Sequence, residues 1–312
     1  MTPTDESDNN AMHLLLSQNS EWQSDGDYCI HLQGYNRPLD AALKKFRLLM
    51  EDPNGHKLHQ GVNWLGNKPI HTAFWSMQSE PGLLHELLDP KWALDIWEPN
   101  SDGNTTLHLA CDSGSGEGVR LLLARDDVDV NCKNNKGQTP LHMACDWDRP
   151  IVWSCPGYNF GEREHGDKKA LMHDYFDDPQ LVRPVELLLG HSSIDLSARD
   201  EEGRTALHLA SYYRNAETAK LLIERGADVN ARDDNQETPL YWLVIGVIKR
   251  PEWTLPVRKP LRTLLEAGAD PEAKDAKGKT PAEFMASFGG KDAFSDAVEA
   301  GNIKKDGEDS NV

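Results

Sequence analysis

Residues 137–144 read Gly-Gln-Thr-Pro-Leu-His-Met-Ala, and copies of this octapeptide recur through most of the 312-residue chain. Two strong copies are Gly-Asn-Thr-Thr-Leu-His-Leu-Ala at 103–110 and Gly-Arg-Thr-Ala-Leu-His-Leu-Ala at 203–210. Weaker copies occupy 66–73, 236–243 and 278–285. Six copies of one multi-residue pattern indicate an internal repeat, which decides the fold before any single residue is considered.

The octapeptide carries the signals of a helix start. Thr139 can cap free backbone N–H groups, and Pro140 suits the first helical position, where its missing N–H costs nothing. Leu141 and Ala144 are three residues apart and share one face, and the small alanine allows a second helix to approach closely. The leucines at 187–189 provide the apolar stripe of that second helix.

A second recurring segment supports the repeat. It reads Leu-Leu-Ile-Glu-Arg-Gly-Ala-Asp-Val-Asn at 221–230 and Leu-Leu-Glu-Ala-Gly-Ala-Asp at 264–270. Together the two patterns resemble the ankyrin repeat family over roughly residues 64–290. The resemblance implies an all-α ankyrin-repeat solenoid of about six stacked helix-turn-helix units with β-hairpin tips and two insertions. It also implies that Gly226 ends a second helix as a left-handed cap and that 227–234 form a hairpin.

The spacing of the motif locates the insertions. Well-matched copies start 33 or 34 residues apart, but 66 residues separate Gly137 from Gly203 and 42 separate Gln236 from Gly278. In both long intervals the extra residues follow the first helix, and no further Thr-Pro-Leu-His lies within them. The sequence therefore predicts insertions, rather than a hidden repeat, at about 146–181 and 246–259.

Both ends of the array differ from the repeats. Apolar residues recur at helical spacing over 38–51, which predicts a helix that caps the exposed end of the stack. The expected organisation is a polar, flexible segment at 1–33, a capping helix within 34–62, the repeat array at 63–300, and a flexible tail at 301–312.

Four motif histidines invite a catalytic or metal-binding interpretation: His71, His108, His142 and His208. The family resemblance instead implies that each imidazole bonds the backbone of its own turn and of the neighbouring repeat. Their fixed place in the motif favours this structural role. Tyr241 replaces the histidine in one repeat, and we expect weaker local hydrogen bonding there.

The charge balance restricts the partners. The chain has 51 acidic and 33 basic residues, a formal net charge of -18, which argues against nucleic acid and anionic membranes and favours a partner with a basic patch. Its five cysteines are odd in number and form no C-x-x-C pair, as expected in a reducing compartment. We expect an intracellular protein, cytoplasmic or nuclear, that is monomeric alone.

The resemblance implies a partner surface made of hairpin tips and the exposed, concave side of each first helix. Several of the residues at these positions are aromatic, the type that anchors interfaces, and two of the tips are acidic. The expected partner-binding residues are Trp75, Asp112, Asn135, Lys136, Asp146, Trp147, Glu201, Glu202, Arg204, Tyr212, Tyr213, Asp234, Asn235 and Glu237. The predicted function is that of a non-catalytic scaffold or adaptor for protein–protein interaction.

An enzyme or metal-binding protein is the rival hypothesis. The 146–181 insertion and its border contain Cys145, Cys155, His165 and His173, which are metal-ligand types. Their spacing matches no short zinc motif, and no catalytic or nucleotide-binding motif occurs, so we expect no catalytic residue, metal or cofactor. The aromatic side chains of this insertion either pack on the array or contact a partner.

Two asparagines leave a further alternative open. Asn131 and Asn230 follow Asp-Val in the segments that lead into the hairpins. Asparagines at such positions can be hydroxylated in the ankyrin family, but hydrogen bonding within the hairpin is the simpler expectation.

Overall fold

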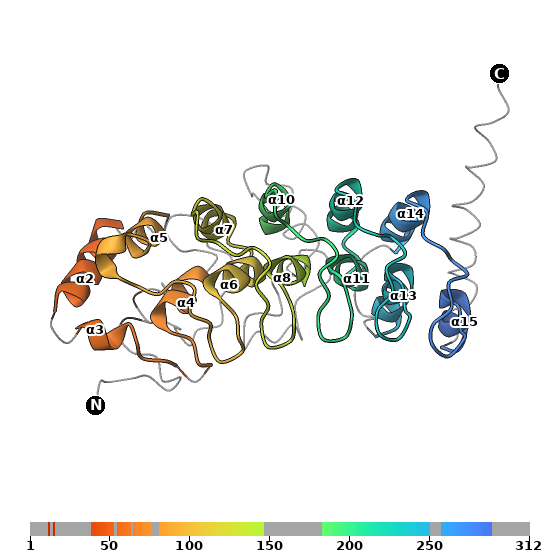
Figure 1. Cartoon of the computed structure of the whole chain (residues 1–312), viewed down its shortest axis with the longest axis horizontal. Helices are drawn as coiled ribbons and strands as arrows, with labels where there is room; N and C mark the ends of the chain where they lie inside the picture. Colours follow the sequence, from red (N-terminus) through yellow and green to blue (C-terminus); the bar gives the residue numbers. More distant parts are fainter. Residues whose placement is uncertain are drawn as a thin grey trace, which may run out of the picture. The chain divides into compact units, whose positions relative to one another are not determined.

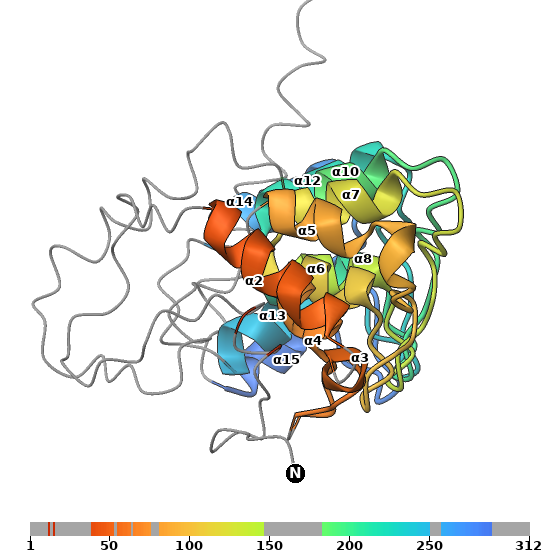
Figure 2. The same ribbon diagram turned by 90° about the vertical axis from the view of Figure 1, so that its left-hand side faces the viewer.

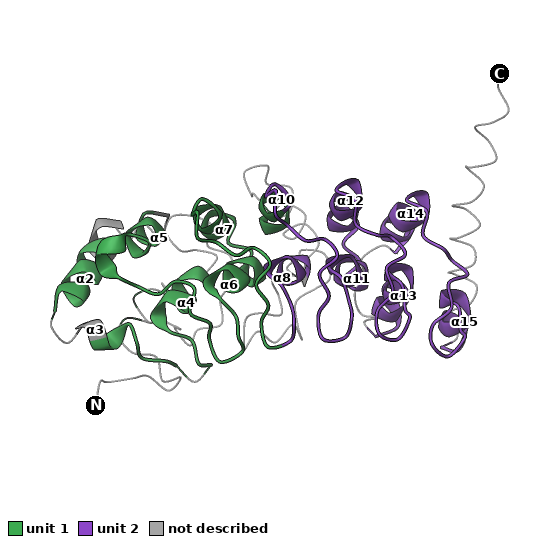
Figure 3. Cartoon of the chain, viewed as in Figure 1, with its two compact units in different colours: residues 1–135, 182–188 green, residues 136–181, 189–312 purple. Residues whose placement is uncertain are grey.

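The structure is a computed structural model of the whole chain (Figure 1), and it describes residues 12, 15, 39–52, 55–63, 65–75, 81–146, 183–249 and 257–288. The chain divides into two compact units, coloured separately in Figure 3. Unit 1 comprises residues 1–135 and 182–188, and unit 2 comprises 136–181 and 189–312. Almost all of the expected terminal segments at 1–33 and 301–312, and of the 146–181 insertion, lies outside the described residues.

Unit 1 is a two-layered arrangement of short helices. Its elements are α2 (Leu39–Glu51), α3 (Gly55–Leu58), α4 (Pro69–Trp75), α5 (Pro81–Leu87), the 3₁₀ helix η1 (Pro90–Trp92), α6 (Thr106–Ser113), α7 (Gly116–Leu123) and most of α10 (Pro184–Leu189). The first helices of its repeats, α4 and α6, pack on each other, as do the second helices, α5 and α7. Helix α2, within the predicted capping segment, packs on α5 and α3.

Unit 2 repeats the same arrangement. Its helices are α8 (Pro140–Asp146), α11 (Ala206–Tyr212), α12 (Ala216–Glu224), α13 (Pro239–Lys249), α14 (Arg258–Glu266) and α15 (Pro281–Ala286). The first helices α8, α11, α13 and α15 form one layer, in which α11 packs on α8 and α13, and α13 packs on α15. The second helices α12 and α14 pack on each other and on the first helices that precede them, as Figure 1 shows.

Caps and small residues define the helix ends. Thr105 precedes α6, where its side chain and that of His108 form a reciprocal capping box. Gly114, with φ of 76°, ends α6 in the left-handed conformation. The Ser115 hydroxyl then accepts from the Gly118 N–H at 3.2 Å and starts α7. One short loop therefore stops the first helix and starts the second.

The core lies between the two layers. Leu107 and Ala110 of α6 and Leu122 of α7 are at most 1% exposed. Burying each leucine contributes about 1.5–3 kcal/mol, and the alanine keeps the helices close. In unit 2, Gly246 of α13 lies so near α11 that a Cβ atom there would be 2.1 Å from the Tyr212 carbonyl oxygen. A larger residue would therefore push these two helices apart.

The second helices end as the sequence indicates. Gly226 follows α12 with φ of 94°, so the prediction of a left-handed cap is confirmed. Its N–H donates to the Ile223 carbonyl at 2.9 Å, and the Ala227 N–H donates to the Leu222 carbonyl at 3.0 Å. These bonds satisfy carbonyl groups that the end of a helix leaves without intrahelical partners.

The 246–259 insertion begins inside a helix. Helix α13 continues through Gly246 to Lys249 and has 11 residues, whereas α11 has 7, and α14 starts at Arg258. Residues 250–256 lie outside the described part of the chain. Part of the extra length in this repeat is therefore a longer first helix.

Loops precede the first helices and form the tips of the repeats. In the end view of Figure 2, these loops project from the same side of the helices within each unit. The loops turn back like hairpins, but none of the described residues is in a strand. Backbone bonds close each turn: in one of them the Asp233 N–H donates to the Glu237 carbonyl and the Gln236 N–H donates to the Asp233 carbonyl, both at 3.0 Å.

Candidate functional site

Each tip loop is shaped by an asparagine or aspartate at its first position. In unit 1, the Asn100 side-chain oxygen accepts from the backbone N–H groups of Asp102 and Asn104, at 3.0 and 2.9 Å. In unit 2, Oδ1 of Asp233 accepts from the Glu237 N–H at 2.8 Å. Such bonds satisfy the N–H groups that a tight turn leaves unpaired, so the tips have a defined shape.

Successive tips within a unit are joined through their backbones. Single N–H to carbonyl bonds of 2.8–3.1 Å run from Asn135 to Asp102 in unit 1, and from Glu201 to Lys136, Asp234 to Glu202 and Ala276 to Asn235 in unit 2. Tips that are joined in this way present their side chains at regular intervals.

Most of the predicted tip contacts are exposed. Six of them have exposed side chains: Asn135, Lys136, Glu201, Glu202, Asp234 and Asn235. Arg204 and Glu237 are partly buried, because both take part in contacts beneath the tips of unit 2. The structure thus brings Glu201, Glu202 and Asp234 together on one edge of unit 2.

Four side chains form a charged and aromatic cluster beneath these tips, here called the Arg204–Trp242 cluster. The buried Asp200 carboxylate accepts from Nε and Nη2 of Arg204 at 2.8 and 2.7 Å. The Arg204 guanidinium lies over the Trp242 ring, 5.1 Å from its centroid. The Trp242 indole N–H donates to Oδ2 of Asp233 at 2.8 Å. The cluster therefore connects two neighbouring tips through one tryptophan.

Sequence reasoning missed Trp242. It occupies the position after the motif histidine, which holds Leu109, Met143 and Leu209 in other repeats. The signal in the sequence was a tryptophan at a position where other repeats have leucine or methionine. Trp242 is 8% exposed and belongs to the hydrophobic core around α13. Its polar contacts are with Arg204 and Asp233, which only the fold brings close to it.

Acidic groups accumulate around Glu237. Its pKa is raised to about 7, first by burial and then by the negative charges of Asp233 and Asp275. Burial raises the pKa of Asp275 as well, but hydrogen bonds from the Lys279 N–H and the Tyr241 hydroxyl outweigh it and lower the pKa. Unit 2 therefore carries a carboxyl group that titrates near neutral pH.

The motif histidines have the structural role that the resemblance implied. His208 accepts at Nδ1 from the Thr205 N–H at 3.0 Å, so its Nε2 carries the proton that is shared with the Glu237 carbonyl at 3.2 Å. His142 makes the same pair of bonds, to the Thr139 N–H and the Arg204 carbonyl. Burial lowers the pKa of His208 to about 4, so its ring stays neutral at physiological pH.

The two repeats that lack the histidine retain different parts of this arrangement. The Tyr241 hydroxyl donates to Oδ2 of Asp275 at 2.8 Å, so tyrosine keeps a bond toward the next tip. Glu283 keeps the other part: its carboxylate accepts from the Thr280 N–H at 2.9 Å, within its own turn. The expected weakening at Tyr241 therefore concerns the bond within the turn, while the bond to the next tip has a substitute.

The predicted first-helix contacts in unit 1 are Trp75 and Asp112. Trp75 is 42% exposed, and its indole N–H donates to Oδ2 of Asp112 at 3.1 Å. An exposed tryptophan held in one orientation by a carboxylate can pack against a partner with little loss of side-chain entropy.

In unit 2 the two neighbouring tyrosines differ. Tyr212 is the last residue of α11, is partly exposed and packs against Trp242, with ring centroids 5.6 Å apart. Tyr213 caps the helix and is only 8% exposed, because the chain turns there into the loop before α12. Of the two tyrosines, Tyr212 is therefore the one whose side chain a partner could contact. Asp146 ends α8, but its side chain and all of Trp147 lie outside the described residues.

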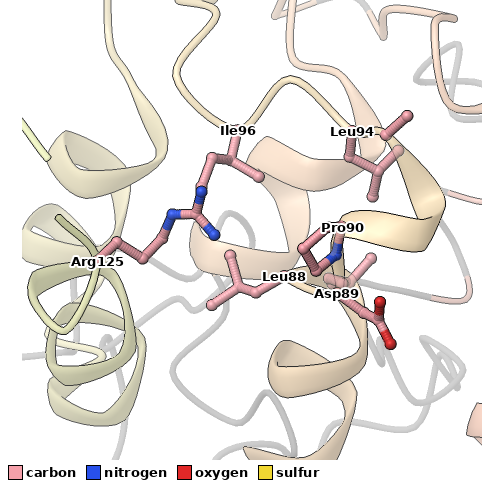
Figure 4. Close-up of a pocket in the computed structure, with 8 residues that line it drawn as sticks. Leu88, Asp89, Pro90, Leu94, Ile96 and Arg125 are labelled. Carbon is pink, nitrogen blue, oxygen red and sulfur yellow. The ribbon is translucent and has the colours of Figure 1, made fainter. Parts of the chain in front are cut away.

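A small pocket lies in unit 1, beside η1 (Figure 4). It has a volume of about 250 Å³ and is lined mainly by apolar side chains, among them Leu88, Leu94 and Ile96. Its charged residues are already paired: Arg125 with Asp127 at 2.8 Å, and Asp89 with Lys91 at 3.0 Å. Its lining therefore brings together no set of catalytic groups.

One cysteine–histidine pair in unit 1 resembles a nucleophile and its base. Sγ of Cys132 lies 3.9 Å from Nδ1 of His108, but this nitrogen already accepts from the Thr105 N–H at 3.2 Å. Burial raises the pKa of the Cys132 thiol, which disfavours the reactive thiolate. Within the described ranges no group of His, Cys, Asp or Glu could hold a metal ion, and no helix is long and apolar enough to cross a membrane.

The chain is similar to known repeat proteins. A family model described as "Ankyrin repeats (3 copies)" matches residues 76–154 and 177–247, and so leaves out the centre of the predicted long insertion. The putative ankyrin repeat protein FPV230 of fowlpox virus is 41% identical over 70 residues, 22% of this chain and 37% of that protein. Potassium channel AKT1 of Arabidopsis thaliana is 34% identical over 171 residues, 55% of this chain and 19% of the channel.

The human B-cell lymphoma 3 protein gives both a sequence and a structural likeness. It is 38% identical over 69 residues, 22% of this chain and 15% of that protein. The crystal structure of the ankyrin repeat domain of Bcl-3 matches with a TM-score of 0.54 at 22% identity, covering 89% of this chain and 94% of that domain. The chain matches less than two-fifths of the length of each of these curated relatives, whereas the structural likeness extends along nearly all of this chain.

Proposed function

Since this chain is an ankyrin-repeat protein, we propose that it is a non-catalytic scaffold that binds another protein through its tip loops and the exposed side of its first helices. Ankyrin repeats are generally protein–protein interaction modules, and their fold is typically non-enzymatic. Function must still be argued from this chain's own surface, because one fold serves many partners.

The observation that carries the proposal is that neighbouring acidic residues of unit 2 differ in burial and in role. Asp200 and Asp233 are buried and hold the tips in shape, whereas Glu201 and Asp234, next to them in sequence, are exposed. The tips would fold equally well without the exposed pair, since the loop-closing bonds are made by the buried one and the tip-to-tip bonds by the backbone. Exposed side chains with no role in the fold, carried on loops of fixed shape, are what a binding surface requires.

The charge of this surface favours a partner with a basic patch. Glu201, Glu202 and Asp234 project along one edge, with the partly exposed Tyr212 ring beside the Arg204–Trp242 cluster. Acidic groups at a rim accelerate the approach of a basic partner, and an aromatic ring provides apolar contact area. In unit 1, Trp75 provides the corresponding aromatic contact.

A matched pair of variants tests the proposal. In the tip variant, Glu201→Gln and Asp234→Asn remove two exposed charges from the tips of unit 2. In the control, Glu224→Gln and Glu266→Gln remove two exposed charges from the second helices. A partner identified by affinity capture and then purified should bind the tip variant about three- to tenfold more weakly than the control, chiefly through a slower association rate.

Trp75→Ala tests the contribution of unit 1 separately. We expect a similar or larger loss of affinity if Trp75 lies at the centre of the interface. Equal binding of the same purified partner by wild type, the tip variant and Trp75→Ala would refute the proposed surface. The rival metal or enzyme site at 146–181 lies outside the described residues and stays a prediction, which metal analysis of the purified protein tests.

A further inference from the structure

One tryptophan side chain touches three separate parts of unit 2. The Arg204 guanidinium lies over the Trp242 ring, 5.1 Å from its centroid, and the indole N–H donates to Oδ2 of Asp233 at 2.8 Å. The ring of Tyr212, at the end of α11, packs on the tryptophan with centroids 5.6 Å apart. Arg204 and Asp233 belong to two successive tips, so a single side chain joins two loops and a first helix.

Both loop contacts lead to the carboxylate that closes a tip. In the tip at 200–204, the Asp200 carboxylate accepts from two backbone N–H groups, at 3.0 and 2.9 Å, and from the Arg204 guanidinium. In the tip at 233–237, Asp233 also accepts from two backbone N–H groups, at 2.9 and 2.8 Å. The residues that fix the shape of the two tips are therefore connected through the tryptophan.

The tryptophan ring is closely packed and cannot adapt freely to one neighbour. It is 8% exposed and lies in a cluster with Tyr241 and Ile245 of the same helix. One turn further along α13, a Cβ atom at Gly246 would be 2.1 Å from the Tyr212 carbonyl oxygen, so α11 and α13 approach as closely as a glycine permits. In a close-packed interior a displacement is passed on to the neighbours, because no free volume absorbs it. A movement of either tip therefore displaces the ring and, through it, the other tip.

Leucine at the same motif position cannot make this link. Leu109 and Leu209 occupy the position in two other repeats, and both are 5% exposed. A leucine has neither a ring face for a cation nor an N–H donor. Trp242→Leu therefore introduces a residue that other repeats accept at this position, and it removes the link.

We propose that Trp242 is a positioning residue that couples the tips at 200–204 and 233–237 and the Tyr212 ring into one element of the binding surface. A contact that orders one of these parts orders the others through the tryptophan. The coupled element favours a partner segment that touches both tips and Tyr212 at once, because all of its contacts share the cost of ordering them. The coupling exists in the free chain, and its use in binding rests on the proposed function above.

Amide hydrogen exchange in the free, whole chain tests the coupling as a double-mutant cycle. Arg204→Met removes the cation from the ring face, so the Asn235 and Glu237 N–H groups of the other tip should exchange about three- to fivefold faster, relative to the amides of α12. In a Trp242→Leu background the same substitution should leave the exchange of these two groups unchanged. The backbone bond between the two tips involves neither side chain and so cannot account for the difference.

Glu202→Gln is the matched control for Arg204→Met. It removes the exposed second partner of the arginine and leaves the contacts of Arg204 with Asp200 and Trp242 in place. Exchange in the tip at 233–237 should then stay as in wild type. Faster exchange there would mean that any change in one tip spreads to the next without the tryptophan, and it would contradict the proposal.

Trp242→Phe keeps the experiment decisive if Trp242→Leu does not fold. The phenylalanine retains a ring for the Arg204 guanidinium and lacks the N–H donor to Asp233, so Arg204→Met should again have no effect on the second tip in this background. Acceleration by Arg204→Met of the same size in wild type and in either tryptophan variant, or no acceleration in wild type, would overturn the proposal.

The purified partner tests whether binding uses the coupling. Trp242→Phe leaves every exposed charge in place, so the association rate constant should stay within about twofold of wild type. The dissociation rate constant should rise about threefold or more, because the two tips no longer hold each other in place. An unchanged dissociation rate would show that the tryptophan does not position the binding surface. Failure of the proposed function gives a different result: the tip variant of Glu201 and Asp234 then binds as its control does, while the exchange cycle still reports the coupling.

Discussion

The tips of unit 1 and unit 2 have the same loop geometry but are held by different chemistry. In unit 1, neutral amides bridge successive tips: Asn100 donates to Asn67 at 2.7 Å, and Asn134 donates to Asn104 at 2.8 Å. In unit 2, the positions of Asn100 and Asn104 are taken by Asp200 and Arg204, which form an ion pair.

The difference shows what the loop geometry requires. It needs a side-chain acceptor at the first position, which asparagine and aspartate supply equally well. Amides make this bond without a charge, so the bridges between the tips of unit 1 depend little on pH or salt. Carboxylates are stronger acceptors, but they bring repulsion and proton exchange with them, as at Glu237. Three pairs of substitutions sharpen the comparison.

The largest effect is expected from removing the first residue of a tip. Asp233→Ala removes a charged acceptor from two backbone N–H groups and the Trp242 indole, whereas Asn100→Ala removes a neutral amide that accepts from two backbone N–H groups and donates to Asn67. Urea unfolding should show a loss of about 3–5 kcal/mol for Asp233→Ala and about 2–3 kcal/mol for Asn100→Ala. Asp234→Ala, at an exposed neighbour, should cost less than about 0.5 kcal/mol. Equal losses for the two main variants would mean that charge adds nothing to the tip of unit 2.

A smaller effect, of opposite sign in the two units, is expected at the apex of the tips. Gly103 has φ of 77°, and a Cβ atom there would lie 2.7 Å from the backbone nitrogen of Asn135, so Gly103→Ala should destabilise the protein by roughly 2–3 kcal/mol. In the 233–237 tip of unit 2 the equivalent residue is Gln236, with φ of 62°, whereas the other tips of this unit have glycine there, as at Gly203. Glycine adopts this conformation without strain, so Gln236→Gly should stabilise by about 0.5 kcal/mol. Thermal unfolding measures both, and a stabilising Gly103→Ala would contradict the fit of the stacked loops.

The smallest effect concerns salt. Arg204→Met removes the ion pair with Asp200 but keeps an apolar chain over Trp242, and should cost about 1 kcal/mol at low salt. That cost should fall by a few tenths of a kcal/mol between roughly 0.05 and 1 M NaCl, because salt screens the partly exposed Arg204 guanidinium and its exposed second partner, Glu202. Asn104→Ala, which breaks a neutral pair in unit 1, should cost a similar amount at every salt concentration. A salt-independent cost at Arg204 would show that packing, not charge, is what the arginine contributes.

Much of the fold could be read from the repeated octapeptide. The helix starts and the cap at Gly226 follow from local signals, since caps and turns involve residues close in sequence. The structural role of the histidines was implied by the family resemblance, because one of the two bonds of His208 and of His142 reaches the next repeat. The partner-binding residues remain a prediction. The structure adds that Tyr213 is buried and Tyr212 is not, a distinction that depends on where α11 ends.

The substitution of histidine by Tyr241 shows where local reasoning stops. Its position in the motif indicates a lost bond, but its hydroxyl reaches Asp275, 34 residues away, by way of the neighbouring tip. Trp242 is a similar case, because Arg204 and Asp233 come from two separate loops. No pattern within one repeat specifies which side chains the next repeat brings to it.

The sequence by itself determined that this protein is a stack of helix pairs with turned loops, because each repeat carries its own start, stop and spacing signals within about 33 residues. Only the tertiary structure decided which carboxyl groups of the tips are buried and hold the loops in shape, and which are exposed. The reason is physical: a propensity acts along the chain, whereas a charge responds to whatever the fold places within a few ångströms of it.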